Sequence, residues 1–234
     1  MEHYYTPNEL VLKETLTIEG DEAKHLGKVL RKESGAVIYV TDGEGNLYKC
    51  RIENVVKSKI ECLILEQSHN ETENKTRVTL YQSLLKNPDR FEFAIEKSVE
   101  LGVYAIQPII TEHVISKGRD KSERWNSISL AAMKQSERTC LPKVNAPLSF
   151  VEAIKHCKDE LKLIAHEKGP GIRITDSGFE KVNSIALFIG PEGGFSDDEI
   201  KLAEDNGFKT ITLGKRKFRS ETAALSGVYS LLFT

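Results

Sequence analysis

The stretch 187-LFIGPEGGFSDDEI-200 holds the end of an apolar run, a turn with three glycines and the start of a predicted helix. Ser196 and Glu199 have the spacing of a capping box, which predicts a helix directly after the turn. A strand, a glycine turn and a helix N-terminus in this order are typical of a backbone cradle for an anion. Pro191 has no amide hydrogen, however, and Glu192 brings a carboxylate into the turn. The stretch therefore predicts a ligand loop of an α/β fold, for a ligand other than phosphate.

On both sides of this stretch, predicted strands alternate with predicted helices, which indicates a mostly parallel α/β sheet. One helix is marked by Asn87 as N-cap, by Pro88 in its first turn and by Gly102 just past its end. The predicted strands cover residues 77–85, 105–110, 161–166, 184–190 and 209–214, and the predicted helices cover 87–102, 122–136, 150–158, 197–206 and 221–233.

The N-terminal part of the chain has a different pattern, with short runs rich in Val, Ile and Tyr. One helix is predicted before them, over residues 21–31, with Ala23, Leu26, Val29 and Leu30 on its apolar face. The predicted strands cover 36–41, 47–56 and 59–66, with a two-glycine turn at 42–46 that joins the first two into a hairpin, and the polar run 67–76 is the best linker candidate. This pattern predicts a small β-barrel or sandwich module ahead of the α/β domain.

The composition is that of an ordinary soluble globular protein, with 39% hydrophobic and 29% charged residues among 234. No apolar run is long enough to span a bilayer and the N-terminus has no secretory pattern, so we expect a cytoplasmic protein without a membrane partner. The four cysteines lack C-x-x-C spacing and are expected to be buried thiols. No H-E-x-x-H motif or other His/Cys set indicates a metal site.

Charge is unevenly distributed along the chain. The net charge of −2 argues against an indiscriminate nucleic-acid binder. Residues 115–143, however, hold seven Lys or Arg against three acids, and residues 209–219 hold five Lys or Arg and no acid. Local basic patches on a nearly neutral chain favour a specific anionic partner. For the first patch, an ordinary solvated surface is an equally good interpretation.

Three loops with glycine follow predicted strands, at residues 165–171, 189–196 and 213–221. Ligands of open α/β sheets bind beyond the carboxyl ends of the strands, so the three loops predict one composite pocket. No nucleotide-triphosphate or dinucleotide motif is present. Apolar strand ends with a nearby carboxylate suit an adenosine-like group that carries positive charge, as S-adenosyl-L-methionine does.

Several segments together resemble the RsmE family, which methylates N3 of a uridine in 16S ribosomal RNA of the small subunit. The resemblance is carried by the stretch quoted above followed by LGKRKFRSETAAL (213–225), and by SLLKNPDRFEFAIEKSVELGV (83–103), RWNSISLAAMKQSER (124–138), LPKV (141–144), HLGKVLR (25–31) and DGEGNLYKCRI (42–52). It therefore covers nearly the whole chain.

The resemblance implies a PUA-like RNA-binding β-barrel over residues 1–72 and, over residues 73–234, an α/β methyltransferase domain of the SPOUT type with a deep C-terminal trefoil knot. It also implies a homodimer and S-adenosyl-L-methionine as cofactor. The cofactor-binding residues would be Ile189, Gly190, Pro191, Glu192, Gly193, Gly194, Leu213, Gly214, Phe218 and Thr222. The RNA-binding residues would be His25, Arg31, Lys86, Arg138 and Arg216.

The same resemblance implies Arg219 and Glu221, of the family's R-x-E-T motif, as the catalytic residues. Arg219 would donate to a uracil carbonyl, and Glu221 would either position Arg219 or accept the N3 proton. A first-turn carboxylate that favours the helix dipole is the alternative interpretation of Glu221. His3 and His113 stand where arginine is common in the family.

Two other functions remain open from the sequence. One is a related methyltransferase that modifies a ribose 2′-oxygen or another base. The other is an assembly factor that binds ribosomal RNA without catalysis.

Residues 1–72 hold 9 Lys or Arg and 13 Asp or Glu, so RNA contacts of this part are expected at one edge only, near Arg31.

Overall fold

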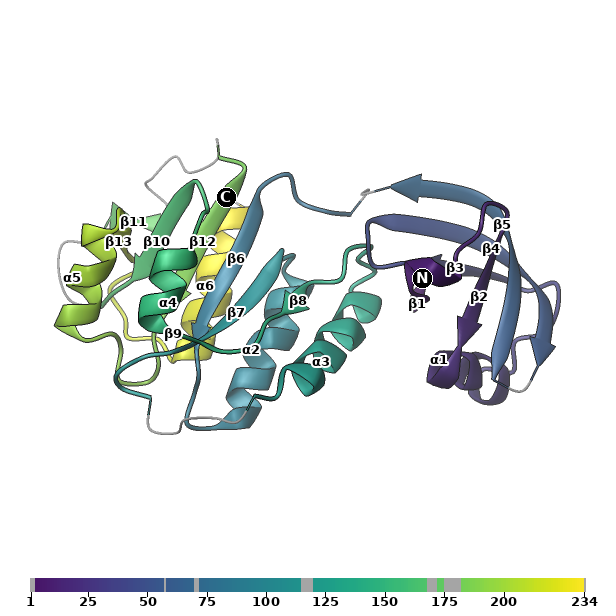
Figure 1. Cartoon of the computed structure of the whole chain (residues 1–234), viewed down its shortest axis with the longest axis horizontal. Helices are drawn as coiled ribbons and strands as arrows, with labels where there is room; N and C mark the ends of the chain where they lie inside the picture. The colour runs from purple at the N-terminus through teal and green to yellow at the C-terminus, as the bar shows by residue number, and fades with distance from the viewer. Residues whose placement is uncertain are drawn as a thin grey trace. The chain divides into compact units, whose positions relative to one another are not determined.

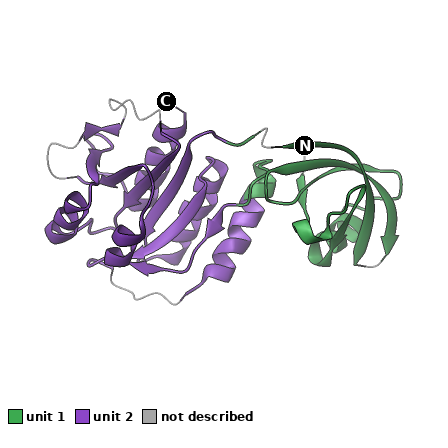
Figure 2. Ribbon diagram, turned by 45° about the horizontal axis from the view of Figure 1, so that its top comes forward, with its two compact units in different colours: residues 1–73, 133–141 green, residues 74–132, 142–234 purple. Residues whose placement is uncertain are grey.

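The computed structural model describes residues 3–56, 58–69, 72–114, 120–167, 172–174 and 182–233 (Figure 1). The chain forms two compact units, residues 1–73 with 133–141 and residues 74–132 with 142–234 (Figure 2). Residues 168–171 of the first predicted pocket loop lie outside the described residues, as do Lys117 and Arg119 of the first basic patch.

The first unit contains a five-stranded sheet in the order β1-β3-β4-β5-β2. Its strands are β1 (His3–Tyr5), β2 (Thr15–Glu19), β3 (Val37–Thr41), β4 (Asn46–Val56) and β5 (Lys59–His69), with a 3-10 turn, η1, at Asn8–Leu10. The predicted hairpin of β3 and β4 is confirmed, because the two strands pair antiparallel. The Thr6 hydroxyl, just after edge strand β1, donates to the carbonyl of Thr17 in the other edge strand, β2. A side chain thus connects the two edges of the curled sheet.

The predicted helix of this unit is shorter and changes its winding. It consists of α1 (Gly20–Lys24) followed by a π-helical segment, η2 (His25–Val29). Ala23 and Leu26 are buried as predicted, but Val29 and Leu30 are exposed, so their placement on the apolar face is wrong. The amide of Leu30 bonds to the carbonyl of His25, a five-residue spacing that turns the following side chains off the buried face.

The boundary between the units is more complex than a single linker. Strand β5 reaches His69, so the predicted linker 67–76 begins inside a strand. Residues 133–141 belong to the first unit because their backbone pairs with the turn after β3. The amide of Leu141 donates to the carbonyl of Gly43 at 2.8 Å, and the Thr41 hydroxyl donates to the carbonyl of Thr139 at 2.9 Å. The division 1–72 and 73–234 therefore omits a segment distant in sequence.

The second unit is built on a sheet in the order β11-β13-β10-β12-β6-β7-β8, with β9 also on β7. All these pairings are parallel. The strands are β6 (Arg77–Ser83), β7 (Ala105–Ile110), β8 (Lys143–Val144), β9 (Leu148–Ser149), β10 (Leu161–Ala165), β11 (Ile172–Arg173), β12 (Ser184–Ile189) and β13 (Lys209–Thr212). The predicted mostly parallel α/β sheet is confirmed.

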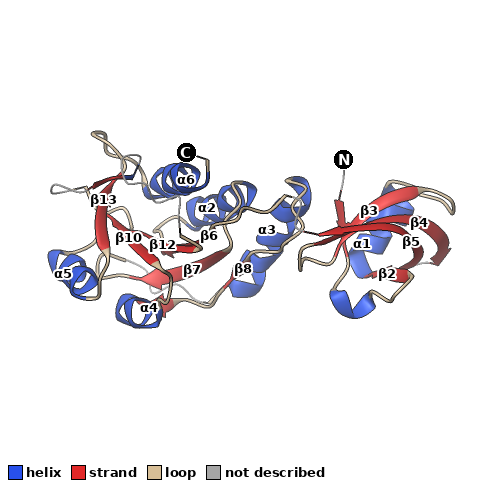
Figure 3. Cartoon of the chain, turned by 90° about the horizontal axis from the view of Figure 1, so that it is seen from above, coloured by secondary structure: helices blue, strands red, loops and turns tan. Residues whose placement is uncertain are grey.

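Helices cover both faces of this sheet (Figure 3). They are α2 (Pro88–Glu100), α3 (Ser122–Gln135), α4 (Phe150–His156), α5 (Asp197–Asp205) and α6 (Ser220–Leu232), with α2, α3 and α6 on one face and α4 and α5 on the other. The Asn87 cap of α2 and the Ser196–Glu199 capping box of α5 are both confirmed. No helix among the described residues has the length and apolar character that crossing a bilayer requires.

Candidate functional site

The carboxyl ends of the parallel strands β10, β12 and β13 open onto one cavity of about 740 Å³. Three stretches line it, at residues 165–167, 189–197 and 212–220, together with His113 and Ala223. These stretches coincide with the three glycine-containing loops, so the predicted composite pocket is confirmed over its described residues. Parallel pairing explains the result, because it brings the ends of distant strands to the same edge of the sheet.

Nine of the ten residues expected at the cofactor line this cavity: Ile189, Gly190, Pro191, Glu192, Gly193, Gly194, Leu213, Gly214 and Phe218. The tenth, Thr222, is exposed on α6 and is absent from the cavity wall, whereas its neighbour Ala223 belongs to it. Successive residues of a helix point about 100° apart, so a continuous motif cannot present all its members to one cavity.

The glycine loop folds back tightly on itself. The amide of Gly194 donates to the carbonyl of Pro191 at 2.9 Å, and Gly194 has a φ of +73°, a conformation that favours glycine. A Cβ at Gly190 would lie 3.2 Å from backbone atoms of Gly194 and Phe195. Gly190 and Gly194 therefore serve the close approach of the loop's own backbone, whereas Gly193 leaves room for the side chain of His113. The side chain of Glu192 is exposed.

A chain of hydrogen bonds ties this loop to the N-terminus of α6. Buried Gln82, at the end of β6, donates to the Ser220 hydroxyl at 2.9 Å, and that hydroxyl donates to the carbonyl of Gly190 at 2.5 Å. These two hydrogen bonds join three segments that are far apart in sequence. They thereby set the position of the two cavity walls relative to each other.

Replacing Ser220 with alanine removes the hydroxyl that both hydrogen bonds share. The amide of Gln82 and the carbonyl of Gly190 then lose their partner, which costs about 1–3 kcal/mol of free energy. We expect the affinity for S-adenosyl-L-methionine to fall by about five- to a hundredfold, measured by isothermal titration calorimetry. Ser226→Ala, on the same helix but outside the cavity wall, is the matched control. Equal affinity of the two variants would contradict a positioning role for Ser220.

The loop after β7 is fastened to the glycine loop as well. His113 lines the cavity, and its Nδ1 lies 3.0 Å from the carbonyl oxygen of Gly194. Glu199 accepts from the amides of Glu112 and Ser196, at 2.9 and 3.0 Å. His113 thus contributes to the cavity wall, which the sequence pattern alone does not indicate.

Charged groups surround the mouth of the cavity. Lys217 pairs with Glu167 at 3.3 Å, and this contact joins the first loop to the third. Glu192 accepts from the backbone amide of Lys86 at 3.3 Å. Arg216 and Arg219 line the cavity and are exposed. The wall therefore combines carboxylates with an excess of basic side chains on the third loop.

Glu221 lies beside the cavity, outside its wall. It is 7% exposed, and its Oε1 lies 3.8 Å from Nε of Arg90 on α2. Its other oxygen is buried and has no hydrogen-bond partner among the described residues. Arg219 thus lines the cavity, whereas Glu221, two residues later, faces α2. The same change of direction along the helix keeps Thr222 out of the cavity wall. Sequence reasoning missed Arg90, because nothing in the local pattern 87–93 shows that its partner lies on α6.

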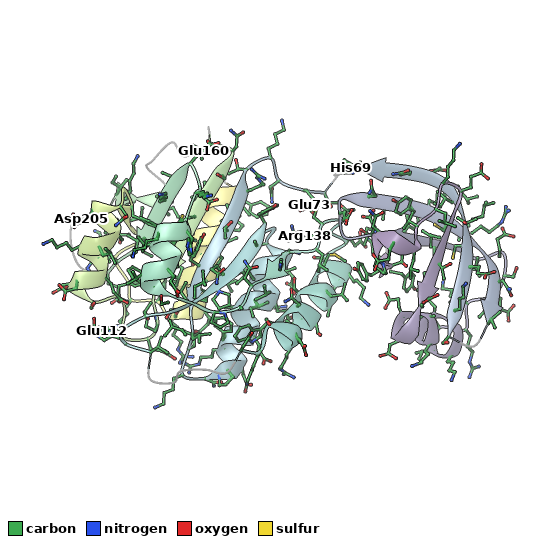
Figure 4. The ribbon with its side chains drawn as sticks, in the orientation of Figure 1. His69, Glu73, Glu112, Arg138, Glu160 and Asp205 are labelled. Carbon is green, nitrogen blue, oxygen red and sulfur yellow. The ribbon has the colours of Figure 1, made fainter. Side chains whose placement is uncertain are left out.

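The residues expected to contact RNA fall into different environments. Lys86 is exposed in the second unit; His25 and Arg31 are exposed in the first. Arg138, by contrast, is 5% exposed and donates to Glu73 through Nε at 3.2 Å and Nη2 at 2.5 Å (Figure 4). Glu73 also accepts from the amides of Thr139 and Cys140. This corrects the expectation for Arg138, whose guanidinium is an internal anchor of the first unit.

Of the five described basic residues of the first patch, three are paired within the chain. Three of its side chains donate to carboxylates: Arg124 to Glu92, Lys134 to Glu22 and Arg138 to Glu73. For these three residues the structure favours paired side chains over a surface for an anionic partner. Four of the five basic residues of the second patch line the cavity: Lys215, Arg216, Lys217 and Arg219.

The remaining titratable groups of interest are buried. Burial raises the pKa of the Cys50 and Cys62 thiols to about 12, so both are protonated, inert core residues. Burial also lowers the pKa of His3, whose Nδ1 has no hydrogen-bond partner among the described residues. A buried neutral imidazole does not serve as a phosphate contact. Within the described ranges, no three His, Cys, Asp or Glu side chains gather as metal ligands.

Comparison with known families supplies two matches. The profile of an RNA methyltransferase domain family matches residues 72–231, and that of an RNA methyltransferase PUA domain matches residues 18–65. The chain is 33% identical to ribosomal RNA small subunit methyltransferase E of Synechocystis sp. (strain ATCC 27184 / PCC 6803 / Kazusa), over 96% of the chain and 76% of that relative.

Two solved structures are similar over almost the whole chain. One is a ribosomal RNA small subunit methyltransferase E from Neisseria gonorrhoeae bound to S-adenosyl methionine, with a TM-score of 0.88, 34% identity and coverage of 97% of this chain and 95% of that chain. The other is a methyltransferase from Legionella pneumophila in complex with SAM, with a TM-score of 0.87, 32% identity and coverage of 98% and 96%. The range matched by the RNA methyltransferase profile, residues 72–231, includes every residue of the cavity described above.

Proposed function

The chain belongs to the RNA methyltransferase family that includes the ribosomal RNA small subunit methyltransferases E, and from this premise we propose that it methylates N3 of a uridine in 16S ribosomal RNA with S-adenosyl-L-methionine as the methyl donor. The observation that carries the proposal is the single cavity formed by the glycine loop and the basic third loop. A cytoplasmic site of action follows from the ribosomal substrate.

The cavity fits this cofactor in size and in chemistry. Its volume of about 740 Å³ lies in the range of small-molecule sites, roughly 300–1,000 Å³. Ile189, Leu213 and Phe218 supply apolar surface for an adenosine group. Glu192 and Glu167 supply carboxylates near a ligand that carries two positive charges. Backbone groups of the glycine loop supply the remaining donors and acceptors.

When bound, S-adenosyl-L-methionine would supply a methyl group on a cationic sulfur, and the sulfur would keep the electrons of the carbon–sulfur bond as the methyl carbon bonds to N3 of uracil. The task of the protein is to favour the uracil that has lost its N3 proton. Arg219 lines the cavity, is exposed to an incoming base and stays charged at all relevant pH values. Its guanidinium donates to a carbonyl oxygen of uracil and stabilises the negative charge that forms there.

We propose that RNA is held by both units. The first unit matches the family's PUA domain, and its exposed His25 and Arg31 belong to the π-helical turn and the residues after it. In the second unit, Lys86 and Arg216 lie on loops that contact the cavity wall or form it. The functional division is thus an RNA-binding unit followed by a methyltransferase unit. The target base reaches the cavity out of its stack, as chemistry on a base requires.

We further propose that the second unit has the knotted SPOUT topology. Strand β13 lies beyond β10 in the sheet, yet α6 packs on β6, β12 and α2. The chain after β13 therefore returns across the sheet and passes the glycine loop, where Ser220 bonds to Gly190. This return path supports a trefoil knot at the cofactor cavity.

A homodimer is the proposed assembly. On the last turn of α6, Tyr229 and Phe233 stack with ring centroids 5.1 Å apart, yet they are 52% and 55% exposed. Two adjacent exposed aromatic rings are a costly surface for a monomer and a usual feature of protein interfaces. We infer that this end of α6 packs against a second copy of the chain.

Replacing Tyr229 with aspartate is expected to convert a dimer of twice 26.3 kDa into a monomer, because it places a charge in a desolvated contact. Sedimentation equilibrium or light scattering measures the mass. Val56→Asp changes an apolar residue that is also 52% exposed, but in the first unit, and is expected to leave the mass unchanged. A wild-type chain that remains monomeric at the concentrations of the methylation assay would contradict the proposal.

The methylation proposal is tested by nucleoside mass spectrometry of 16S ribosomal RNA from cells with and without the gene. Loss of 3-methyluridine supports it. Loss of a 2′-O-methylated nucleoside would favour a related methyltransferase instead, and an unchanged nucleoside profile with altered subunit assembly would favour the non-catalytic factor.

A further inference from the structure

The ion pair between Arg90 and Glu221 lies next to the cavity but outside its wall. Helices α2 and α6 run parallel: Arg90 and Glu221 face each other in their first turns, and Leu232 at the end of α6 lies against Gly102 just past the end of α2. Glu221 directly follows Ser220, which is part of the cavity wall. Arg90 therefore contacts α6 one residue beyond the cavity wall.

The two side chains of this ion pair differ in their exposure to solvent. The Glu221 side chain is 10% exposed, whereas that of Arg90 is 38% exposed. The separation of 3.8 Å between Nε and Oε1 is electrostatic contact without a hydrogen bond. Among the described residues, none accepts a hydrogen bond from the Arg90 guanidinium. The guanidinium thus lies against a buried carboxylate, and its side chain is partly open to solvent, where a ligand can reach it.

Two other basic residues, Lys86 and Arg219, lie near Arg90 on the side of the cavity. The loop that leads into α2 is joined to the glycine loop through the Lys86 amide and Glu192. Arg219, two residues before Glu221, is exposed at the cavity. The basic residues near the cavity mouth are accordingly Lys86, just before α2, Arg90 on α2 and Arg219, the N-cap of α6. We call these three residues the basic rim.

We propose that Arg90 binds a backbone phosphate of the RNA next to the target uridine, and that Glu221 is a positioning residue that acts through Arg90. The inference rests on the proposed function. A phosphate is the fitting ligand because a guanidinium presents parallel donors to it, and because Arg90 lies outside the cavity that receives the base. Glu221 is buried and absent from the cavity wall, which is a poor place for a group that takes the N3 proton.

The test is steady-state methylation of small ribosomal subunits that lack the modification. Arg90→Met keeps the length of the side chain and removes its charge. We expect KM for the subunit to rise by about ten- to a hundredfold, with kcat changed by less than about twofold. The affinity for S-adenosyl-L-methionine, measured by calorimetry, should be unchanged. The slope of log affinity for the subunit against log salt concentration should decrease by about one.

A matched control is Arg124 on α3, whose carboxylate partner lies on the same helix as Arg90. Glu92 on α2 accepts two hydrogen bonds, of 2.6 and 2.7 Å, from Arg124, so this pair is already satisfied within the protein. Arg124→Met removes the same charge and is expected to leave KM and the salt slope unchanged. Arg90→Lys keeps the charge but loses the parallel donors, and should recover part of the affinity.

Glu221→Gln and the double variant Glu221→Gln/Arg90→Met separate the roles of the pair. A positioning role predicts that Glu221→Gln raises KM and that the double variant is no worse than Arg90→Met alone. A Glu221→Gln variant with lowered kcat, unchanged KM and an altered pH profile would instead assign proton transfer to Glu221 and overturn this part. If Glu221→Gln does not fold, Arg90→Met still decides the phosphate contact.

Two outcomes are distinguishable. If the wild-type protein methylates small subunits and Arg90→Met behaves as Arg124→Met does, the phosphate contact is refuted and the proposed function stands. If the wild-type protein transfers no methyl group to small subunits, the proposed function itself fails, and the inference fails with it.

Discussion

Replacing Arg219 with alanine is expected to lower kcat for methyl transfer by about a hundred- to a thousandfold, the usual effect of removing a donor to a developing anion. Arg219 is exposed at the cavity wall, at the N-cap of α6, where its backbone position is set by the helix start. In the mechanism that we propose, its charge acts on the base that enters the cavity. Affinity for S-adenosyl-L-methionine should remain near the wild-type value, because apolar and backbone groups of the loops form the rest of the wall.

The measurement combines steady-state methylation of small subunits, which gives kcat and KM, with calorimetric cofactor binding. Arg216→Ala is the comparison variant, since Arg216 is on the same loop and is assigned to RNA binding. It should raise KM and leave kcat largely unchanged. A normal kcat in Arg219→Ala would remove Arg219 from the catalytic site, and loss of cofactor binding would assign it to the cofactor.

Replacing Arg138 with methionine is expected to destabilise the first unit by about 3–5 kcal/mol, the usual cost of breaking a buried ion pair. The side chains of Arg138 and Glu73 are 6% and 14% exposed. Without the guanidinium, the carboxylate of Glu73 keeps only weak bonds, of 3.3 and 3.2 Å, to the amides of Thr139 and Cys140. The segment 133–141 would then lose one of its contacts with the rest of the unit, the buried one through Glu73.

Thermal unfolding of the full chain measures the loss, and hydrogen exchange locates it. Exchange should accelerate at Gly45, whose amide donates to Thr139 of this segment, and at Leu141 of the segment, whose amide donates to Gly43. The control is Arg51→Met, which breaks an exposed pair with Glu53 and should cost less than about 1 kcal/mol. Unchanged stability together with weaker RNA binding would restore Arg138 to the RNA surface.

The cavity was predictable from the sequence because its signals are local. Glycines, Pro191 and the Ser196–Glu199 capping box mark where β12 ends and α5 begins. Parallel strands then bring such ends together, whatever their distance along the chain. Nine of the ten expected cofactor residues line one cavity for this reason.

Side-chain pairing across the fold was not predictable. The partner of Arg138 is Glu73, the partner of Glu221 is Arg90, and Ser220 joins Gln82 to Gly190. Each contact links segments that no periodicity relates. The same limit applies to Thr222, since a contiguous motif on a helix faces several directions.

The N-terminal helix shows a different limit. An α-helical period places Val29 and Leu30 on the buried face, but the chain adopts a π-helical turn at His25–Val29. Both side chains are exposed as a result. Local winding of this kind is decided by packing against the sheet, which the apolar pattern does not reveal.

The most direct test of the central claim is methyl transfer by the purified protein from isotopically labelled S-adenosyl-L-methionine to small ribosomal subunits that lack the modification, followed by nucleoside mass spectrometry. The account predicts label in 3-methyluridine at one position of 16S ribosomal RNA with the wild-type protein, and almost none with Arg219→Ala. Label in a 2′-O-methylated nucleoside, or no transfer by the wild-type protein, would contradict it.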